Sequence, residues 1–553
     1  MSSMPRRART VALCRSHAHR NSSAQRCAVK LLVTITLTVA AVAAAGAPAP
    51  TGGDAEQFRP QYHFSPSRHW MNDPNGMVYL DGEYHLFFQY NPDAEVWGPM
   101  HWGHAVSTDM LHWRELPIAL RPDAHGTIFS GSVVADLRNT SGLGAPGRAP
   151  LIALFTSHDE AAKRAGRVDF QTQGMAYSLD KGRTWTKYAG NPVLPNPGLR
   201  DFRDPKVSWF EPQNKWVMTL VAGDHVSFYS SKDLRAWRHE SDFGQQWGAH
   251  GGVWECPDLV EMRVDGESAR KYVLLVSVNP GAPNGGSGTQ YFVGEFDGHR
   301  FVLDEGWQRR LRPAPTTNSP AAAWVDYGAD DYAGVTWSNL PRGRRVFLGW
   351  MSNWRYAQQV PTQTWRSAMT LPRDLTLVRS PRGLELRAMP IAEVTGLRRA
   401  SVRLPAQLVR TELDMTGGLK ANAGRLELNL TVDTAAADST AVTFSNAVGE
   451  STVFRINRAQ HRYELDRSRS GTVDFHPQFA DMQSAPLPAG ATITRLRVWL
   501  DHSSLEIFIN EGETVLTAIE FPATPYTRIG LEADAPIEMK SATVYALDVA
   551  RQP

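Results

Sequence analysis

Cysteine is scarce in this chain, with only Cys14, Cys27 and Cys256 among 553 residues. The first two lie in an N-terminal segment that we interpret below as a leader, so Cys256 would be the sole thiol of the mature chain. One thiol can form neither an internal disulfide framework nor a thiolate metal site. A chain of this length that is 42% hydrophobic is large enough to fold around its core alone.

Long apolar runs are missing as well. The main one, residues 31–45, contains three threonines and is shorter than the roughly 20 residues that a membrane-spanning helix needs. It follows a basic stretch that ends at Lys30 and precedes small residues, which is typical of a secretory signal peptide. We therefore expect a signal peptide at residues 1–47, a linker at 48–57, and an extracellular or periplasmic mature protein. A membrane anchor is the alternative interpretation.

No strong excess of charge of either sign is present. The formal net charge is +2, and removing the seven basic residues of the leader changes it to −5. A nucleic-acid partner requires a basic face to bind phosphates, so a mildly acidic body argues against one. We expect neither a nucleic-acid partner nor a membrane partner once the signal peptide is removed.

Helical periodicity is absent from most of the remaining chain. Short apolar segments, such as residues 84–90, 151–155 and 272–278, are separated by Gly, Pro, Asn and Asp. This pattern predicts β-strands joined by turns. The chain also contains 17 Trp, 15 Tyr and 21 Phe, which favours a β-protein with aromatic surfaces.

One short pattern occurs three times. Ser, a spacer and Asp are followed by Trp at Ser107 to Trp113, at Ser178 to Trp185, and at residues 231–237. A turn with an aromatic residue that recurs at about the length of a four-stranded unit suggests the blades of a β-propeller. Unrelated hairpin turns are the alternative, because Ser and Asp are common in turns.

The pattern changes near residue 384. Residues 384–398 contain Pro390 and are expected to connect two domains. Beyond them, residues 426–432 and 505–510 alternate apolar and polar side chains, as the strands of a two-sheet sandwich do. We therefore expect an all-β chain, with a β-propeller at residues 58–383 and a β-sandwich at 399–553.

Three carboxylates stand out by their settings. Asp73 lies in WMNDPNG at residues 70–76, which predicts a tight turn that holds the carboxylate rigidly beside Trp70, although a plain Asx turn explains the same residues. Asp204 follows Arg203, a pair that is usually a solvated ion pair. Glu255 lies between Trp and Cys, and an apolar setting favours the protonated carboxyl that a general acid needs.

Together these residues suggest glycoside cleavage. That reaction needs one carboxylate to attack the anomeric carbon and a second carboxyl group to protonate the leaving oxygen. The inner strands of different blades converge on the axis of a propeller, so residues far apart in the sequence can meet there. Aromatic residues near the three motifs would stack on sugar C–H surfaces, or alternatively belong to the cores of the blades: Trp97, Trp102, Phe129 and Trp354.

The ordered motifs of the chain resemble those of glycoside hydrolase family 32, which includes invertases, inulinases and levanases. The matching segments are QYHFSP at residues 61–66, WMNDPNG at 70–76, FFQYNP at 87–92, WGPMHWGH at 97–104, FSGS at 129–132, RDP at 203–205 and WECP at 254–257. The similarity extends from about residue 57 to near the C-terminus and weakens in the second domain.

The resemblance implies a five-bladed β-propeller followed by a β-sandwich, with a retaining mechanism at C2 of a terminal β-fructofuranosyl unit. By resemblance Asp73 is the nucleophile, Glu255 is the general acid/base and Asp204 stabilises the transition state. The residues expected to bind substrate are Trp70, Asn72, Gln89, Trp97, Phe129, Ser130, Arg203 and Trp354. No metal or cofactor is implied. His101 and His104 are separated by an odd spacing that would point them to opposite faces of a strand.

These observations predict a secreted exo-acting β-fructosidase that acts on fructans such as levan and inulin, and also on sucrose. The stretch at residues 277–294 resembles the microbial fructan-degrading exo-enzymes more than the intracellular sucrose hydrolases. A fructosyltransferase with the same catalytic residues and a non-catalytic fructan-binding protein are the alternatives.

Overall fold

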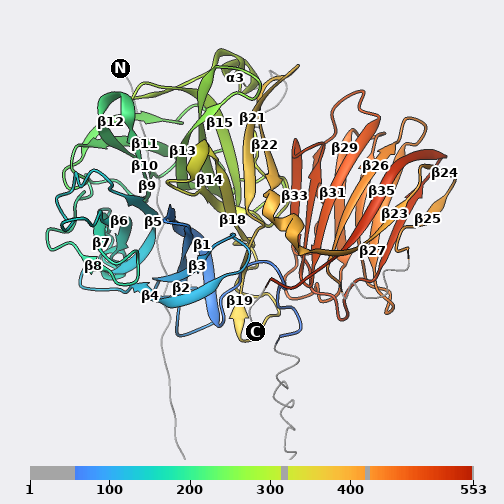
Figure 1. The fold of residues 1–553 in the computed structure, drawn as a ribbon, viewed down its shortest axis with the longest axis horizontal. Coiled ribbons are helices and arrows are strands. Elements are labelled where there is room, and N and C mark those ends of the chain that lie inside the picture. Colours follow the sequence, from blue (N-terminus) through green and yellow to red (C-terminus); the bar gives the residue numbers. More distant parts are fainter. Residues whose placement is uncertain (1–55, 313–321, 418–423, 551–553) are drawn as a thin grey trace, which may run out of the picture. The chain divides into compact units, whose positions relative to one another are not determined.

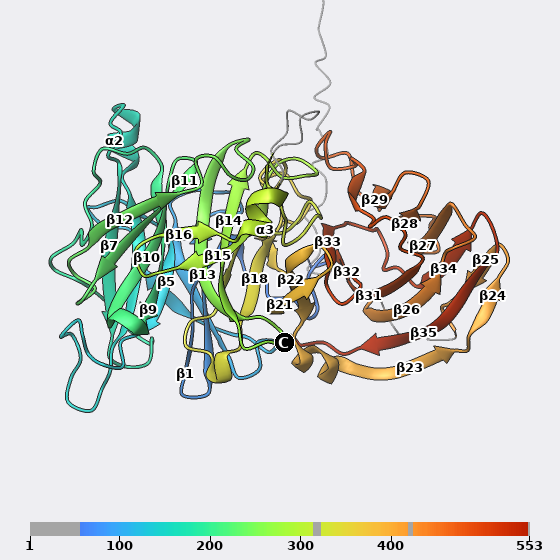
Figure 2. The same ribbon diagram turned by 90° about the horizontal axis from the view of Figure 1, so that it is seen from above.

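The computed structural model describes residues 56–312, 322–417 and 424–550. The predicted signal peptide and nearly all of the predicted linker lie outside these ranges. Figures 1 and 2 show that almost all regular structure is β-strand, which confirms the all-β prediction. Within the described residues, no helix is both long enough and apolar enough to span a bilayer.

The described residues between 69 and 390 form five mostly antiparallel sheets. The first contains β1 (His69–Leu80), β2 (Glu83–Asn91), β3 (His101–Ser107) and β4 (Arg114–Leu120), with β19 (Trp365–Arg366) beside β1. The second contains β5 (Thr127–Ala135), β6 (Leu151–His158), β7 (Gln171–Ser178) and β8 (Thr186–Lys187). The third contains β9 (Phe202–Phe210), β10 (Lys215–Ala222), β11 (His225–Ser231) and β12 (Arg238–Phe243).

The fourth sheet contains β13 (Val253–Arg263), β14 (Arg270–Asn279), β15 (Gly288–Phe296) and β16 (Phe301–Leu303). The fifth contains β17 (Tyr332–Thr336), β18 (Val346–Met351), β21 (Arg373–Ser380) and β22 (Gly383–Pro390), with β20 (Ala368–Met369) beside β18. The helical segments described in this part of the chain are short: α2 (Glu160–Arg164), α3 (Glu305–Arg310), η1 (Glu211–Gln213) and η2 (Pro341–Gly343).

The first strands of the five sheets close a ring. β1 contacts β5, β5 contacts β9, β9 contacts β13, β13 contacts β17, and β17 contacts β1. These strands are largely buried, because each lies between its own sheet and the neighbouring ones. Radially arranged sheets whose inner strands surround one axis form a β-propeller.

The three repeated turns have the same local structure. Each joins the third strand of a sheet to the fourth, and in each the Ser hydroxyl donates to the Asp carboxylate two residues later. The Trp indole N–H then donates to a backbone carbonyl three residues before it, as Trp113 does to Met110. The repeat is therefore a structural unit of successive sheets.

The predicted tight turn at residues 70–76 is wrong. These residues lie within strand β1, which pairs with β2 through two irregularities, between Met71 and Pro74 and between Asn75 and Val78. Pro74 lacks an N–H for the ladder, and a bulge accommodates that loss. Gly76 has φ of 53°, and a Cβ there would lie 2.7 Å from the ring of Phe87, so the strand bends where only glycine fits.

The C-terminal part is a two-sheet sandwich. One sheet contains β23 (Arg398–Leu404), β24 (Gln407–Val409), β26 (Leu426–Asp433), β31 (Ile493–Asp501), β32 (Ser504–Ile509), β33 (Thr514–Ile519) and β35 (Ile537–Leu547). The other contains β25 (Glu412–Asp414), β27 (Ser439–Ser445), β28 (Ser451–Asn457), β29 (Arg462–Arg469), β30 (Gln483–Pro486) and β34 (Arg528–Ala533). Alternate residues of β26, such as Leu428 and Leu430, belong to one hydrophobic core, as the period-2 pattern predicts.

The segment expected to connect the two domains differs in part from its prediction. Residues 384–390 form most of β22 and pair with β21, whereas Ala392–Leu397 form the 3₁₀ turn η3 that leads into β23. Pro390 ends the strand, because it has no N–H to continue the ladder.

Buried ion pairs join the propeller to the sandwich. Arg373 of β21 pairs with Glu506 of β32 at 2.6 Å and with Asp326 and Asp331 at 2.9 Å each. His63 pairs with Glu506 and with Asp501, both at 2.8 Å. All of these side chains are buried, so each charge depends on its partners rather than on water.

Candidate active site

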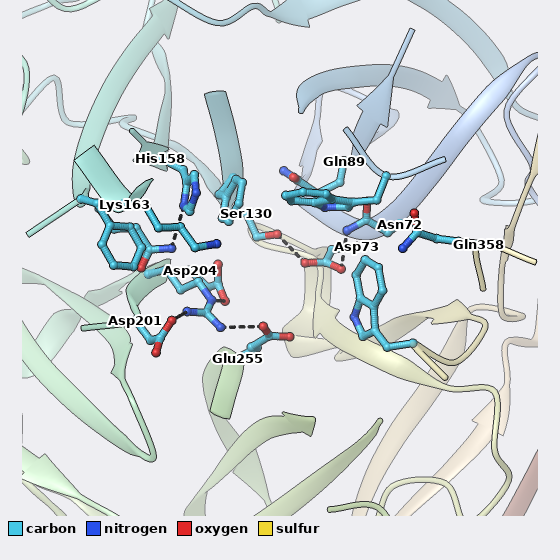
Figure 3. Close-up of a pocket in the computed structure, with 16 residues that line it drawn as sticks. Asn72, Asp73, Gln89, Ser130, His158, Lys163, Asp201, Asp204, Glu255 and Gln358 are labelled. Carbon is cyan, nitrogen blue, oxygen red and sulfur yellow. Dashed lines mark hydrogen bonds and ion pairs between the residues drawn. The ribbon is translucent and has the colours of Figure 1, made fainter. Parts of the chain in front are cut away.

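A pocket of about 270 Å³ lies where the starts of the inner strands meet. Its wall contains Asp73 from β1, Asp204 from β9 and Glu255 from β13, which are far apart in the sequence. Figure 3 shows these three carboxylates around one space, with Asn72 and Gln358 on the side of Asp73. The structure thus brings the three predicted carboxylates together.

An irregularity in strand pairing lies beside each of the three carboxylates. The ladder is irregular between Met71 and Pro74 of β1, opposite Asp204 in the pairing of β9, and between Glu255 and Asp258 of β13. A proline follows each of the positions 73, 204 and 256 and removes the N–H that a regular ladder would use. β-bulges at such places redirect side chains and are common next to active sites.

Positive φ angles cluster at this pocket too. Asp201, Asp204 and Cys256 have φ of 55°, 65° and 46°. Non-glycine residues in this region are strained, and the surrounding structure must hold them there. Asp201 and Asp204 line the pocket, and Cys256 contacts Asp73 and Asp204 from behind the lining.

Asp73 is held by three donors. The Asn72 amide donates to its Oδ1 at 2.9 Å, and the Ser130 hydroxyl donates to its Oδ2 at 2.6 Å. The Cys256 thiol lies 3.4 Å from the same Oδ2. Burial raises the pKa of Asp73, and the charge of Glu255 raises it further, while these hydrogen bonds oppose the change.

Asp204 lies deeper in the wall. Its Oδ2 accepts the Cys256 backbone N–H at 3.1 Å and lies 3.7 Å from Nε of Arg203. Burial raises the pKa of Asp204 to about 7; Arg203 lowers it, and the charges of Glu255 and Asp73 raise it. Burial also raises the pKa of the Cys256 thiol, so that side chain is a neutral neighbour of both carboxylates.

Each carboxylate oxygen of Glu255 accepts a hydrogen bond from a different side chain. Arg203 donates to its Oε1 at 2.7 Å, and the Tyr332 hydroxyl donates to its Oε2. Arg203 also pairs with Asp201 at 2.7 Å, so one buried guanidinium bridges two pocket carboxylates. Arg203 and Asp204 do not form the solvated ion pair that is usual for adjacent residues of opposite charge, because Arg203 is only 8% exposed.

Most residues predicted to bind substrate line the pocket: Asn72, Gln89, Trp97, Phe129, Ser130, Arg203 and Trp354. Trp70 is the exception. It is completely buried, packs against Trp350 and Trp354, and donates its indole N–H to Asn72 at 2.7 Å. Trp70 therefore holds Asn72 in place instead of facing the pocket.

Sequence reasoning missed six residues of the wall: His158, Lys163, Phe170, Gln171, Asp201 and Gln358. Asp201 could have been predicted as a pocket residue, because it is acidic and lies two residues before Arg203. The others lie at the ends of β6 and β7, in loops or in the one-turn helix α2, where neither hydrophobic periodicity nor a motif marks them.

The described residues contain no group of three or more His, Cys, Asp or Glu side chains placed to hold a metal ion. His101 and His104 of β3 have different environments. His101 contacts the Pro99 carbonyl at 3.0 Å, whereas His104 lies 3.0 Å from His85 in the core of the first sheet. The residues present offer hydrogen bonds, aromatic faces and carboxylates to a neutral, hydroxyl-rich ligand.

Comparison with known proteins agrees with this geometry. The chain matches the model of the glycosyl hydrolases family 32 N-terminal domain over residues 63–390 and that of the family 32 C terminal over residues 393–546. It is 45% identical to a levanase of Bacillus subtilis over 502 residues, which covers 89% of this chain and 71% of the levanase. It is 42% identical to an extracellular exo-inulinase of Aspergillus niger over 497 residues, covering 85% of this chain and 90% of that protein.

Solved structures show the same fold. The exo-inulinase of Aspergillus awamori superposes with a TM-score of 0.79 at 36% identity, covering 89% of this chain and 99% of that one. The fructofuranosidase of Schwanniomyces occidentalis, solved with fructose, gives a TM-score of 0.77 at 31% identity with the same coverage. The prediction of a propeller followed by a sandwich is confirmed, and the chain belongs to glycosyl hydrolase family 32.

Proposed function

We propose that this protein is an exo-acting β-fructofuranosidase that releases terminal β-D-fructofuranosyl units from fructans, levan and inulin among them, and from sucrose. The observation that carries the proposal is the convergence of Asp73, Asp204 and Glu255 on one pocket with an aromatic wall. Its relatives include a levanase and exo-inulinases. We also propose that it acts outside the cell or in the periplasm, as the name of the extracellular exo-inulinase says of that relative.

The first step is displacement at C2 of the fructosyl unit. Asp73 attacks C2 as the glycosidic bond breaks, and Glu255 gives its proton to the departing oxygen. Asn72 and Ser130 fix the Asp73 carboxylate, so its attacking oxygen does not have to be reoriented. The products of this step are a fructosyl ester of Asp73 and a free sugar or shortened fructan.

The second step releases fructose. Water enters, Glu255 takes one of its protons, and the resulting nucleophile attacks C2 and frees Asp73. Arg203 and Tyr332 keep Glu255 in one position for both proton transfers. Glu255 begins the first step as the neutral acid and the second step as the carboxylate. Two displacements at the same carbon return the original configuration.

Both steps pass through a positively charged, oxocarbenium-like transition state. We assign Asp204 to stabilise it, together with hydrogen bonds to the fructose hydroxyls. A carboxylate in a water-poor pocket stabilises a developing positive charge far better than it would in solution. A pocket at the axial end of the inner strands suits a chain end, which supports release of single fructose units.

The domain division that we propose assigns catalysis to the propeller and leaves the sandwich as a brace. The family models divide the chain at residues 390 and 393, close to the predicted connector. All pocket residues named above come from the propeller side of this division.

A time course of products from levan and from inulin, resolved by chain length, tests the function. Fructose as the sole early product supports exo-hydrolysis, and early oligosaccharides contradict it. Oligosaccharides that grow at high sucrose concentration would favour a fructosyltransferase instead. Asp73→Asn and Glu255→Gln should each abolish turnover in a folded protein, whereas Asp81→Asn, a surface control with a 60% exposed side chain, should leave it unchanged. Near-normal rates in either pocket variant would refute that residue's role.

A further inference from the structure

One segment of the pocket wall is built from turns and bends. Residues 353–362, which we call the wall segment, follow strand β18 closely. Two of them, Trp354 and Gln358, line the pocket. Figure 3 shows Gln358 on the side of the pocket where Asp73 lies. Because turns lack the ladder of hydrogen bonds that fixes a strand, the shape of this wall depends on side chains that hold it from behind.

Tyr356 lies midway between the two pocket residues in the sequence, and the sandwich holds it. Its side chain is almost completely buried, and its ring meets Phe475 at 6.4 Å and Phe479 at 5.2 Å, both edge to face. Its hydroxyl donates to Asp330 at 2.6 Å and accepts from Arg467 of β29 at 2.7 Å. A residue of the sandwich therefore contacts the middle of the wall segment.

Arg467 is a buried cation that depends on every partner it has. Its guanidinium pairs with Asp330 at 2.6 Å and donates to the backbone carbonyls of Phe479 at 2.8 Å and Ile519 at 2.9 Å. Burial raises the pKa of Tyr356, so the phenol stays protonated and donates to Asp330 while it accepts from Arg467. Removing the hydroxyl would leave a buried N–H of a charged group without its acceptor, which costs free energy.

The wall segment has other anchors on either side of Tyr356. Before it, the Asn353 amide donates to the Ala329 carbonyl at 2.7 Å. After it, the guanidinium of Arg366 in β19 donates to three backbone carbonyls: Gln358, Val360 and Thr362. These contacts come from the propeller and hold the two ends of the segment, so the sandwich supplies the contact that fixes its middle.

We propose that Arg467 is a positioning residue of the active site, which acts from the sandwich through Tyr356 on the wall segment. The assignment rests on the function proposed above. The residues that line the pocket do not include Arg467 or Tyr356, so both act from behind it. The three carboxylates come from β1, β9 and β13 and do not depend on the wall segment. Loosening this segment should therefore weaken sugar binding and leave the chemistry at C2 largely intact.

The test removes the contact with little change in packing. Tyr356→Phe keeps the ring, and we expect it to raise KM for sucrose about tenfold, the effect of losing one hydrogen bond to a charged group, with kcat within about twofold of the wild type. Arg467→Lys keeps a positive charge beside Asp330 but cannot make all four hydrogen bonds, so it should raise KM likewise. Tyr526→Phe is the matched control, because it removes an equally buried hydroxyl that bonds to Thr452 within the sandwich at 3.2 Å, and it should keep the wild-type KM.

A double-mutant cycle with Gln358→Ala tests whether the effect is transmitted through the wall segment. If Tyr356 positions Gln358, KM of the double variant should rise by less than the product of the two single increases. Single increases that multiply in the double variant would mean that the two residues act independently, which would refute the transmission.

Other results would also overturn the proposal. An unchanged KM in Tyr356→Phe would mean that the contact does not shape the pocket. The same rise in Tyr526→Phe would assign the effect to a general loss of stability, and a loss of kcat alone would place it at the carboxylates. Urea unfolding of each variant shows that it is folded under assay conditions, and Tyr356→Phe alone decides if Arg467→Lys does not fold.

A wild-type protein that releases no fructose from sucrose would refute the proposed function, which is a different result. The dissociation constant of fructose, measured by titration calorimetry, would then decide the role of Arg467. An increase of this constant in Tyr356→Phe supports the assignment, an unchanged value refutes it, and a wild-type protein that does not bind fructose refutes both proposals.

Discussion

Replacing Asp204 with Asn should abolish activity and yet stabilise the folded protein at neutral pH. The carboxyl group is 5% exposed, and burial together with the charges of Glu255 and Asp73 raises its pKa to about 7 from an ordinary value of 3.8, against the opposing effect of Arg203. At 1.36 kcal/mol per pH unit, ionised Asp204 costs the folded state about 4 kcal/mol. Asn is nearly isosteric and can still accept the Cys256 N–H, so we expect it to recover about half of this or more.

The direction of the pH dependence follows from linkage. The folded pKa of Asp204 lies above the unfolded one, so its ionisation destabilises the folded state. The penalty is complete above about pH 7 and declines as pH falls toward 4, where the carboxyl group is protonated in both states. The stabilising effect of Asp204→Asn should therefore be large at pH 7.5 and small at pH 4.

The assay is urea unfolding at these two pH values, monitored by tryptophan fluorescence. The slope m of the unfolding free energy against urea concentration should be the same for the variant and the wild type. Asp81→Asn is the control, because its side chain is 60% exposed and far less affected by burial. A variant that is less stable than wild type at pH 7.5, or whose effect is the same at both pH values, would refute the reasoning.

Three further predictions come from other contacts. Ser130→Ala removes the 2.6 Å donor that lowers the pKa of Asp73, so the acid limb of the kcat/KM profile should move to higher pH by about one unit, and an unmoved limb would contradict this. His63 has its pKa raised to about 9, because hydrogen bonds to Asp501 and Glu506 outweigh burial; about 3 kcal/mol of stability should be present below pH 6.5 and lost as pH rises through 9, and His63→Gln should flatten that loss in urea titrations. Arg203→Gln should lower kcat by about 10²–10³ with folding retained, because Glu255 loses the guanidinium that positions it; a change in KM alone would argue against this role.

Local patterns in the sequence predicted much of the fold. The alternation at residues 426–432 predicted a sandwich strand because burial on one face requires it, and the Ser, Asp and Trp repeat marked the same turn in three sheets. The turn predicted at residues 70–76 was wrong because Pro and Gly also mark bulges, and only the pairing with β2 distinguishes the two. The boundary near residue 384 depended on Pro390, which ends a strand rather than starting a connector.

The three carboxylates of the site could be predicted from sequence motifs rather than from strand patterns. Asp73, Asp204 and Glu255 each lie in a short motif, so their proximity could be inferred by resemblance before any geometry was known. Trp70 shares a motif with Asp73 but is completely buried and bonds to Asn72, and a motif does not record which of its side chains reach the pocket. The pocket residues His158 and Phe170 join Phe129 only through ring contacts between β5, the end of β6 and the segment before β7, a tertiary arrangement that has no local signal.

The same carboxylates contribute to the destabilisation of the folded protein by ionised Asp204 and to the proposed catalysis. Asp73, Asp201, Asp204 and Glu255 line a pocket in which the buried Arg203 pairs with the last three of them. Burial raises the pKa of Asp204, and repulsion from the crowded carboxylates of Glu255 and Asp73 raises it further in the resting enzyme. A positive charge that develops at C2 would relieve this repulsion, so the resting state is disfavoured by the same groups that stabilise the transition state. Loss of activity and gain of stability in Asp204→Asn should thus occur together, and a variant that lost only one of them would separate the two effects.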